Sequence, residues 1–346
     1  MAFSYCPNID LKPTISKLYY DFYQVPEYCR IEAEVLNGKL TYWFKEINGN
    51  CFLIPLIERN IRSKDTIDKD LVSPYGYPGL IYNESVSKKD YIEAIRQFNI
   101  ESGNEGYIST FIRLHPIYNS FVINNLPNIT QHRHGKTVSV NLNLPVNAIR
   151  SGYSQNHKRN IRTLIKKKFS VKTNSWEFFD NFIEVYIGTM KRKNAAGRYL
   201  FTNSYFYKLK EVLGDQLILI SVHNMKNELV AGGLFTIVKG LAQFHLGGTA
   251  ENAIELSPSK LMIDGAIETC KARGAHILHL GGGYGSSATD GLYRFKSGFG
   301  TSTQFFNTLR FIHNPDKYHN LLNSTKINVS GKGDFFPEYR LISGTI

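Results

Sequence analysis

Residues 216–282 constrain the fold most, because they fix the order of strands and helix. The segment 216–249 holds three β-rich runs joined by short polar turns, and the segment 257–275 has helix signals at both ends. Ser257 is expected as the N-cap, Pro258 as the first helical residue, and Gly274 as the residue just past the helix. The run that follows, His276 to Gly283, has the composition of a further strand. Strands followed by a helix and a strand of parallel type predict an α/β fold.

The N-terminal half shows the same kind of order. Residues 40–61 form two β-rich runs around Asn48-Gly49, a strong hairpin signal. The segment 87–102 is expected to be a helix that stops at Gly103, and 106–116 and 135–145 are expected to be strands. Two further helices are predicted at 154–169, capped by Ser154 or Asn156, and at 175–193. We infer a duplicated fold with domains at 1–145 and 146–346.

Composition restricts the class of protein. The chain has 346 residues and is 42% hydrophobic, enough for two cores, and it lacks the run of about 20 apolar residues that a membrane span needs. The first ten residues do not resemble a signal peptide. Cys6, Cys29, Cys51 and Cys270 are scattered, without the C-x-x-C spacing of a metal or redox site. These features predict a reduced, cytoplasmic protein.

The net charge of +12 is unevenly distributed. Residues 1–150 carry 16 Lys and Arg against 15 Asp and Glu, whereas residues 151–346 carry 25 against 14. An anionic partner, such as RNA, a nucleotide or a lipid phosphate, is therefore expected at the C-terminal half. The helix at 154–169 places Lys158, Arg162 and Lys166 in one stripe with Arg159 and Lys167 beside it, and Ile161, Leu164 and Ile165 on the buried face. The stripe is either a solvated surface or a phosphate-binding surface.

The glycine-rich segment 278–300 allows three interpretations: a phosphate cradle, a turn that needs glycine, or a loop that presents one cation. The run from Gly283 to Ala288 fits a dinucleotide-binding fingerprint, but it lacks the following helix–strand unit and the acidic residue for the ribose. If the part after it is extended, Tyr293, Phe295 and Phe299 form an apolar face, and Lys296 points elsewhere. A fixed lysine of this kind is suited to stabilising a developing negative charge.

Taken together and in order, these segments resemble the Fem-type aminoacyltransferases and their relatives in the GNAT superfamily, including acyltransferases found with capsule and O-antigen genes. The matching pieces are the run "SPYGYPG", the basic helix "SQNHKRNIRTLIKKKF", and the run "HLGGG" followed by "DGLYRFKSGFG". The resemblance implies two GNAT-like domains, each with a mixed central sheet flanked by helices. It also implies transfer of an acyl or aminoacyl group to an amine.

The resemblance assigns roles to individual positions. It implies that Phe295 lines the donor channel and that Lys296 stabilises the tetrahedral oxyanion, with Asp290 as the acidic residue before this pair. Tyr75 and Tyr77, around Gly76, match the acceptor segment. The remaining expected substrate-binding residues are Lys158, Arg159, Arg162, Lys166, Gly282, Gly283 and Tyr284.

The sequence gives less information about the acyl donor than about the fold. The helix at 257–275 does not open with the Q-x-x-G-x-[GA] loop that ordinary GNAT enzymes use for coenzyme A. A helix N-terminus still offers N–H groups to an anion, and Ser257, Ser259 and Lys260 are the expected donor-binding residues. We expect no tightly bound cofactor; the donor is acyl-CoA or aminoacyl-tRNA.

The prediction is an N-acyltransferase that moves an acyl group from acyl-CoA to the amine of an amino sugar or a cell-envelope precursor. One alternative is a tRNA-dependent aminoacyltransferase, and another is a non-catalytic protein that binds nucleic acid or an envelope precursor. Peripheral association with the membrane would come from a carrier-linked acceptor. His245 and Glu255 are candidate general bases. No metal site is expected, since His132 and His134 lack a third ligand.

Overall fold

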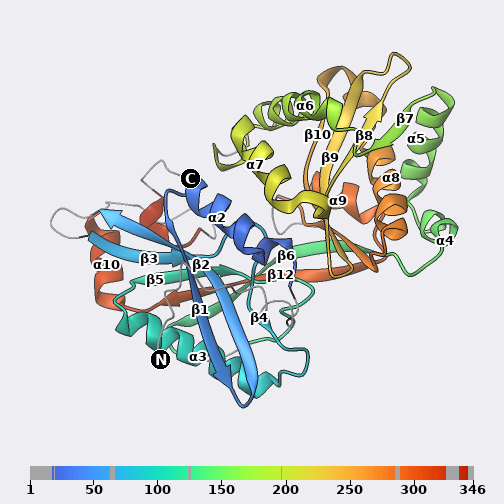
Figure 1. Cartoon of the computed structure of the whole chain (residues 1–346). Coiled ribbons are helices and arrows are strands. Elements are labelled where there is room, and N and C mark those ends of the chain that lie inside the picture. Colours follow the sequence, from blue (N-terminus) through green and yellow to red (C-terminus); the bar gives the residue numbers. More distant parts are fainter. Residues whose placement is uncertain are drawn as a thin grey trace. The chain divides into compact units, whose positions relative to one another are not determined.

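A computed structural model describes residues 18, 20–62, 67–123, 126–195, 197–284, 289–324 and 335–341. Cys6 and the fingerprint positions 285–288 lie outside them. The chain divides into two compact units: residues 1–134 with 306–346 form unit 1, and residues 135–305 form unit 2. Helices and strands are packed together in both (Figure 1). Within the described residues, none of the helices is long and apolar enough to cross a membrane.

Unit 1 is a mixed sheet with a helix on each face. Its elements are η1 (Phe22–Gln24), α2 (Pro26–Val35), β1 (Lys39–Ile47), β2 (Asn50–Arg62), β3 (Ile67–Val72), β4 (Ile81–Tyr82), α3 (Lys88–Asn104), β5 (Ser109–Arg113), β12 (Ser302–Ile312), α10 (Pro315–Ser324) and η6 (Glu338–Arg340). Leu56 packs in the core cluster that contains Tyr91 and Phe98 of α3, whereas the next residue, Ile57, packs against Ala33 of α2. Side chains alternate across a strand, so the two helices cover opposite faces.

Unit 2 is built in the same way. Its elements are β6 (Ile129–Asn141, which begins in unit 1), α4 (Val146–Ser151), α5 (Gln155–Lys166), β7 (Ser170–Thr173), η2 (Trp176–Phe178), α6 (Phe179–Arg192), η3 (Gly197–Tyr199), α7 (Asn203–Leu213), η4 (Gly214–Gln216), β8 (Leu217–His223), β9 (Leu229–Val238), β10 (Leu241–Thr249), η5 (Glu251–Leu256), α8 (Ser259–Ala272), β11 (Ile277–Gly281) and α9 (Gly291–Ser297). Adjacent glycines of β9 face the two covering helices. A side chain at Gly232 would meet Phe182 of α6, and one at Gly233 would meet Met262 of α8.

The two units repeat one topology. In unit 1, β1, β2 and β3 are antiparallel, α3 leads to β5, which is parallel to β3, and β12 is antiparallel to β5. In unit 2, β8, β9 and β10 are antiparallel, α8 leads to β11, which is parallel to β10, and β6 is antiparallel to β11. Each unit is therefore a mixed α/β fold with one crossover helix, and the predicted duplication is visible in the strand order.

The boundaries of the two units differ from those of the predicted domains 1–145 and 146–346, because the end of the chain belongs to unit 1 and unit 2 begins at residue 135. Residues 308–312 of β12 pair with β5 of unit 1, and Tyr318 of α10 packs in a cluster with Ile108. Residues 138–141 of β6 pair with β11 of unit 2. The segment 306–346 therefore belongs with the N-terminal part, and residues 135–145 belong with the C-terminal part.

Several local predictions are confirmed and others are wrong. The hairpin at Asn48-Gly49, the N-cap Ser154 and the turn at Gly274 are as expected. Helix α3 continues through Gly103, and Gly106, with φ of 83°, follows its end instead.

Ser257 is not the N-cap of α8. It adopts a left-handed backbone with φ of 54° at the end of η5, so Pro258 takes the cap position.

Candidate active site

The parallel ladder between β10 and β11 is short, and this sets the position of the candidate site in unit 2. The register joins Leu241 to Ile277 and continues only as far as Gln243 and His279, although β10 runs on to Thr249. The antiparallel pairing of β10 with β9 shifts register between Phe244 and Leu246 at the same level. Beyond Gln243 and His279, β10 and β11 are no longer paired with each other in this ladder.

Lys296 lies at the point where the two strands separate. Its Nζ donates a hydrogen bond of 2.8 Å to the carbonyl of Gly282, the residue that follows β11, and lies 5.8 Å from the ring centroid of Phe244 on β10. The side chain is only 8% exposed. An ammonium has three donors, and the bond to Gly282 is the hydrogen bond that Nζ makes within the described part of the chain. Lys296 is therefore a buried cation that can donate to a further oxygen.

Burial also changes the acidity of this lysine. Loss of solvation lowers the pKa of Lys296 to about 8, while the negative charge of Asp290 acts in the opposite direction. At pH 7, below this pKa, the ammonium form still predominates. The site thus holds a positive charge in a poorly solvated position, where its interaction with an oxyanion is strongest.

Helix α9 carries Lys296, which corrects the extended conformation expected for residues 293–299. Asp290 is the N-cap: its carboxylate accepts hydrogen bonds from the backbone N–H of Tyr293 at 2.8 Å and of Tyr284 at 3.2 Å. An added Cβ at Gly283 would lie 2.2 Å from the Asp290 carboxylate, so glycine is required for this close approach. The start of α9 thus brings together three predicted residues, because Asp290 contacts both Gly283 and Tyr284.

The Phe295 side chain packs against neighbouring side chains of unit 2. Its ring is half-buried against the core of unit 2, with its centroid 5.7 Å from both the His157 and Phe299 rings. Its carbonyl accepts a hydrogen bond of 2.8 Å from His157 Nε2 on α5. The contacts of Phe295 join α9 to the basic helix, a connection that spacing along the sequence does not reveal.

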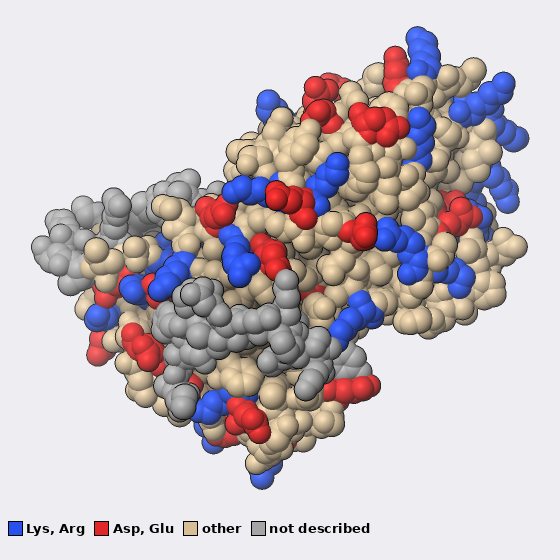
Figure 2. Space-filling view, viewed as in Figure 1, with Lys and Arg blue, Asp and Glu red and all other residues tan. Residues whose placement is uncertain are grey.

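The basic helix α5 is exposed along most of its charged side. Arg159, Arg162, Lys166 and Lys167 are exposed, and so is Ile165 at 57%, which corrects its expected place on the buried face. Lys158 is the exception, because its Nζ donates to the carbonyl of Ser151 at 2.7 Å. Figure 2 shows Lys and Arg side chains gathered at the right-hand edge, where Figure 1 places α5 and β7.

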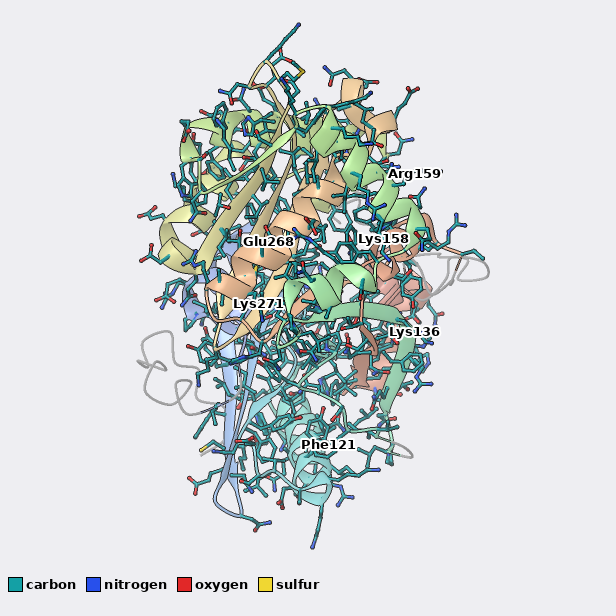
Figure 3. All side chains as sticks on the ribbon, turned by 90° about the vertical axis from the view of Figure 1, so that its right-hand side faces the viewer. Phe121, Lys136, Lys158, Arg159, Glu268 and Lys271 are labelled. Atoms are coloured by element: carbon teal, nitrogen blue, oxygen red, sulfur yellow. The ribbon has the colours of Figure 1, made fainter. Side chains whose placement is uncertain are left out.

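Helix α5 packs against α8. Lys260 of α8 is buried and donates to the side-chain oxygen of Asn156 of α5. Burial lowers the pKa of Lys260, and the positive charge of Arg159 lowers it further. In Figure 3, Lys158 and Arg159 mark α5, and Glu268 and Lys271 mark α8. Two residues predicted for separate roles, Lys260 for the donor and Arg159 for the substrate, therefore form one cationic group.

The other predicted donor residues serve local structure. The hydroxyl of Ser259 hydrogen bonds with that of Thr249 at the end of β10. The carbonyl of Thr249 also accepts hydrogen bonds from Thr189 and Arg192 of α6. Ser259 therefore ties the start of α8 to the end of β10.

The predicted acceptor segment lies in unit 1. A Cβ at Gly76, whose φ is 91°, would come within 2.0 Å of the Tyr23 ring. The Tyr77 ring lies 5.7 Å from Tyr23 and 5.2 Å from Phe306, and the Tyr75 carbonyl accepts from the Tyr28 hydroxyl at 3.2 Å. Tyr23 is the common partner, and only its aromatic character could have suggested it beforehand.

The remaining candidates have less suitable surroundings. Burial lowers the pKa of His245 to about 3, which makes this imidazole a weak proton acceptor, and Glu255 is exposed. The rings of His132 and His134 are 4.6 Å apart, but no group of three or more His, Cys, Asp or Glu side chains suited to a metal occurs within the described ranges.

The comparisons with known proteins agree with this geometry. Residues 151–297, which lie wholly within unit 2, match the family model described as an acetyltransferase (GNAT) domain. Unit 2 therefore contains a GNAT domain, and the chain is an acyl-transferring enzyme, as predicted. No curated protein matches the sequence of the chain.

Solved structures show the same fold over most of the chain. The crystal structure of FemX is similar with a TM-score of 0.65 and 12% identity, covering 92% of this chain and 99% of that one. The C-terminal domain of a putative lysylphosphatidylglycerol synthetase from Agrobacterium fabrum is similar with a TM-score of 0.54 and 13% identity, covering 87% and 94%. L-PGS from Bacillus licheniformis gives a TM-score of 0.51 at 14% identity, covering 84% and 93%. At these identities the similarity concerns the fold.

Proposed function

We propose that the protein is an N-acyltransferase that moves an acyl group from a coenzyme A thioester to the amine of an amino sugar or cell-envelope precursor. The observation that carries the proposal is the buried Lys296 cation at the point where β10 and β11 separate. In the reaction, the amine nitrogen attacks the carbonyl carbon, the carbonyl oxygen becomes an oxyanion beside Lys296, and the thiolate leaves. The proton lost by the amine passes to solvent or to a base.

Phosphates of the substrates are assigned to the cationic group of Arg159 and Lys260 and to the exposed face of α5. Arg159, Arg162 and Lys166 extend from the start of α8 along one side of α5. Contacts of this kind bind phosphate strongly at low salt and weaken as the salt concentration rises. The predicted roles of Tyr75 and Tyr77 in acceptor binding remain part of the proposal.

A second candidate function, transfer of an aminoacyl group from tRNA, is favoured by the start of α8. There, the glycine-rich loop of ordinary GNAT enzymes is replaced by Ser257, Pro258 and Ser259, and Lys260 is bonded to Asn156. The similarity to a lysylphosphatidylglycerol synthetase, whose name describes a lysyl group on a lipid, also fits this alternative. The chemistry at Lys296 would be the same, with a ribose hydroxyl as the leaving group.

A thermal-shift titration with acetyl-CoA, a longer acyl-CoA and free coenzyme A tests the donor. A ligand at 100 times its Kd stabilises the folded state by about 2.7 kcal/mol, so a saturable rise in Tm is expected. Titration with an uncharged tRNA at 0.3 M salt, where non-specific binding is weak, is the comparison. Absence of a shift with every thioester, together with saturable tRNA binding, would contradict the coenzyme A donor in favour of the aminoacyl donor.

The rate of acyl transfer is expected to fall as the pH rises through about 8. The pKa of Lys296 is about 8, so the lysine is cationic below this pH and neutral above it. Only the cation stabilises the oxyanion, and the fall in kcat/KM therefore follows its deprotonation. The pH profile of kcat/KM measures this. In the variant Asp290→Asn, which keeps the helix cap but removes the charge that raises the pKa of Lys296, the fall should move to lower pH. A profile that keeps rising to pH 10 would contradict a cationic role.

A further inference from the structure

Among the described residues, the imidazole of His157 makes a hydrogen bond through one ring nitrogen, and its other nitrogen has no partner. The side chain is 5% exposed, and its Nε2 donates to the Phe295 carbonyl at 2.8 Å. Within the part of the chain that the structure describes, the buried Nδ1 has no hydrogen-bond partner. Burial lowers the pKa of His157, the hydrogen bond to the Phe295 carbonyl acts in the opposite direction, and the charge of the nearby Lys260 lowers the pKa again. Because a carbonyl oxygen can only accept, Nε2 carries a proton.

This arrangement is unfavourable for stability alone. A buried polar atom without a partner carries a desolvation cost at least as large as the net contribution of one ordinary hydrogen bond. The ring is already surrounded by aromatic side chains, with its centroid 4.3 Å from that of Phe299 and 5.7 Å from that of Phe295. A donor in this apolar setting therefore requires a reason other than packing.

The position of the acceptor supplies that reason. The carbonyl of Phe295 belongs to the peptide that joins Phe295 to Lys296, so the hydrogen bond from His157 fixes the orientation of that peptide. Helix α9 has seven residues, too few to be stable without outside contacts. Asp290 holds its N-terminal end. At the other end, Ser154 N–H donates to the Gly298 carbonyl at 2.9 Å, beside His157.

Gly298 shows how closely the imidazole is packed against α9. An added Cβ at Gly298 would lie 2.5 Å from His157 Nε2 and 2.7 Å from its Cε1. Gly298 has φ of −68° and ψ of −11°, a conformation open to any residue, so the ring and not the backbone requires glycine here.

We propose that His157 is a positioning residue for the acyl-transfer site, which holds the Phe295–Lys296 peptide so that the Lys296 ammonium stays at the end of the β10–β11 ladder. The inference rests on the proposed function in assigning the reacting charge to Lys296. The location of Lys296 can nevertheless be measured without turnover.

The test measures the pH dependence of acetylation at Lys296, which depends on the surroundings of this side chain. The protein is labelled briefly with acetic anhydride between pH 6 and 11, and peptide mass spectrometry gives the pH dependence of acetylation at Lys296. In the native chain the midpoint should lie near 8, because Lys296 is buried and faces Asp290, the Phe244 ring and the Gly282 carbonyl. In His157→Asn, whose amide is too short to reach the carbonyl, Lys296 should become hydrated and the midpoint should rise by at least one pH unit. The labelling rate at pH 8 should also change several-fold.

Three variants separate positioning from general damage. His157→Gln places an amide N–H where Nε2 was, and should restore the midpoint near 8. Gly298→Ala keeps His157 but displaces its ring, and should reproduce the effect of His157→Asn, which preserves the test if His157→Asn does not fold. His223→Ala removes another buried histidine of unit 2, bonded to Ser221 and Asn227, and should leave Lys296 unchanged.

Kinetics with the accepted donor complete the test. His157→Asn and Gly298→Ala should lower kcat at least tenfold with little change in KM, whereas His157→Gln should keep most of the activity. An unchanged Lys296 midpoint in both His157→Asn and Gly298→Ala would overturn the inference. If instead the midpoint shifts and the turnover of Lys296→Ala is normal, the positioning role stands and the proposed oxyanion role fails.

Discussion

Replacing Lys296 by alanine is expected to lower kcat by about 10² to 10³-fold while the protein remains folded. This is the typical loss when one donor to a developing oxyanion is removed. The effect should appear in kcat and in kcat/KM alike, because the ammonium interacts with a charge that exists only in the transition state. Steady-state acyl transfer measures the rate, and circular dichroism with thermal unfolding establishes that the fold is kept.

Lys271→Ala is the matched control for this substitution. Its Nζ also donates to a backbone carbonyl, that of Leu142 at 2.6 Å, from the last turn of α8 in the same unit. The control therefore removes the same kind of contact at a distance from the ladder end, and kcat should stay within twofold. Normal turnover of Lys296→Ala, or an equal loss in both variants, would exclude the assigned role of Lys296.

Asp70→Ala is expected to lower the free energy of unfolding of unit 1 by about 3–5 kcal/mol, the usual result of removing one partner from a buried ion pair. Asp70 is fully buried on β3 and accepts hydrogen bonds from Arg59, Arg340 and the Tyr339 hydroxyl. Its removal leaves two guanidinium groups close together, without the carboxylate that neutralises them. It also removes the hydrogen bonds that Arg340 and the Tyr339 hydroxyl donate to β3.

The two tryptophans of the chain make the measurement specific. Trp43 is buried in the core of unit 1, and Trp176 lies in η2 of unit 2, so urea unfolding followed by fluorescence in a Trp176→Phe background reports unit 1. Asp68→Ala, on the same strand, removes a more exposed pair with Lys317 and should cost less than about 1 kcal/mol. Equal effects of the two substitutions would show that the Asp70 cluster has no special importance.

The sequence predicted the presence of the helices and strands better than the residues at which they begin and end. Asn48-Gly49, Ser154 and Gly274 act through their own backbone or side chain, and these local signals were reliable. Gly103 and Ser257 were misread, because a helix tolerates glycine and because a serine can occupy a left-handed turn instead of a cap. The pairing of β12 with β5 joins residues nearly 200 positions apart, and no local pattern encodes it.

The candidate site was predictable in part. Lys296 was found because it stands in a glycine-rich context that resembles a known family. Its burial, and its place at the end of the β10–β11 ladder, depend on the register of strands that the sequence does not specify. His157 was missed, although it lies within the basic helix, because the role we propose for it comes from a contact with a carbonyl 138 positions away. The only early signal was a single histidine at the start of a helix otherwise rich in Lys and Arg.

The exchange of strands between the units has a consequence for synthesis on the ribosome. Every residue of unit 2 has been translated when Phe305 is added, whereas unit 1 still lacks the strand residues 308–312, α10 and the Arg340 contact to Asp70. Domains generally fold as units while the chain is being made. The first translated half must therefore wait, with one side of β5 unpaired by β12, until unit 2 is complete. A nascent chain stalled with residues 1–305 emerged should accordingly show a protease-resistant unit 2 and a protease-sensitive unit 1.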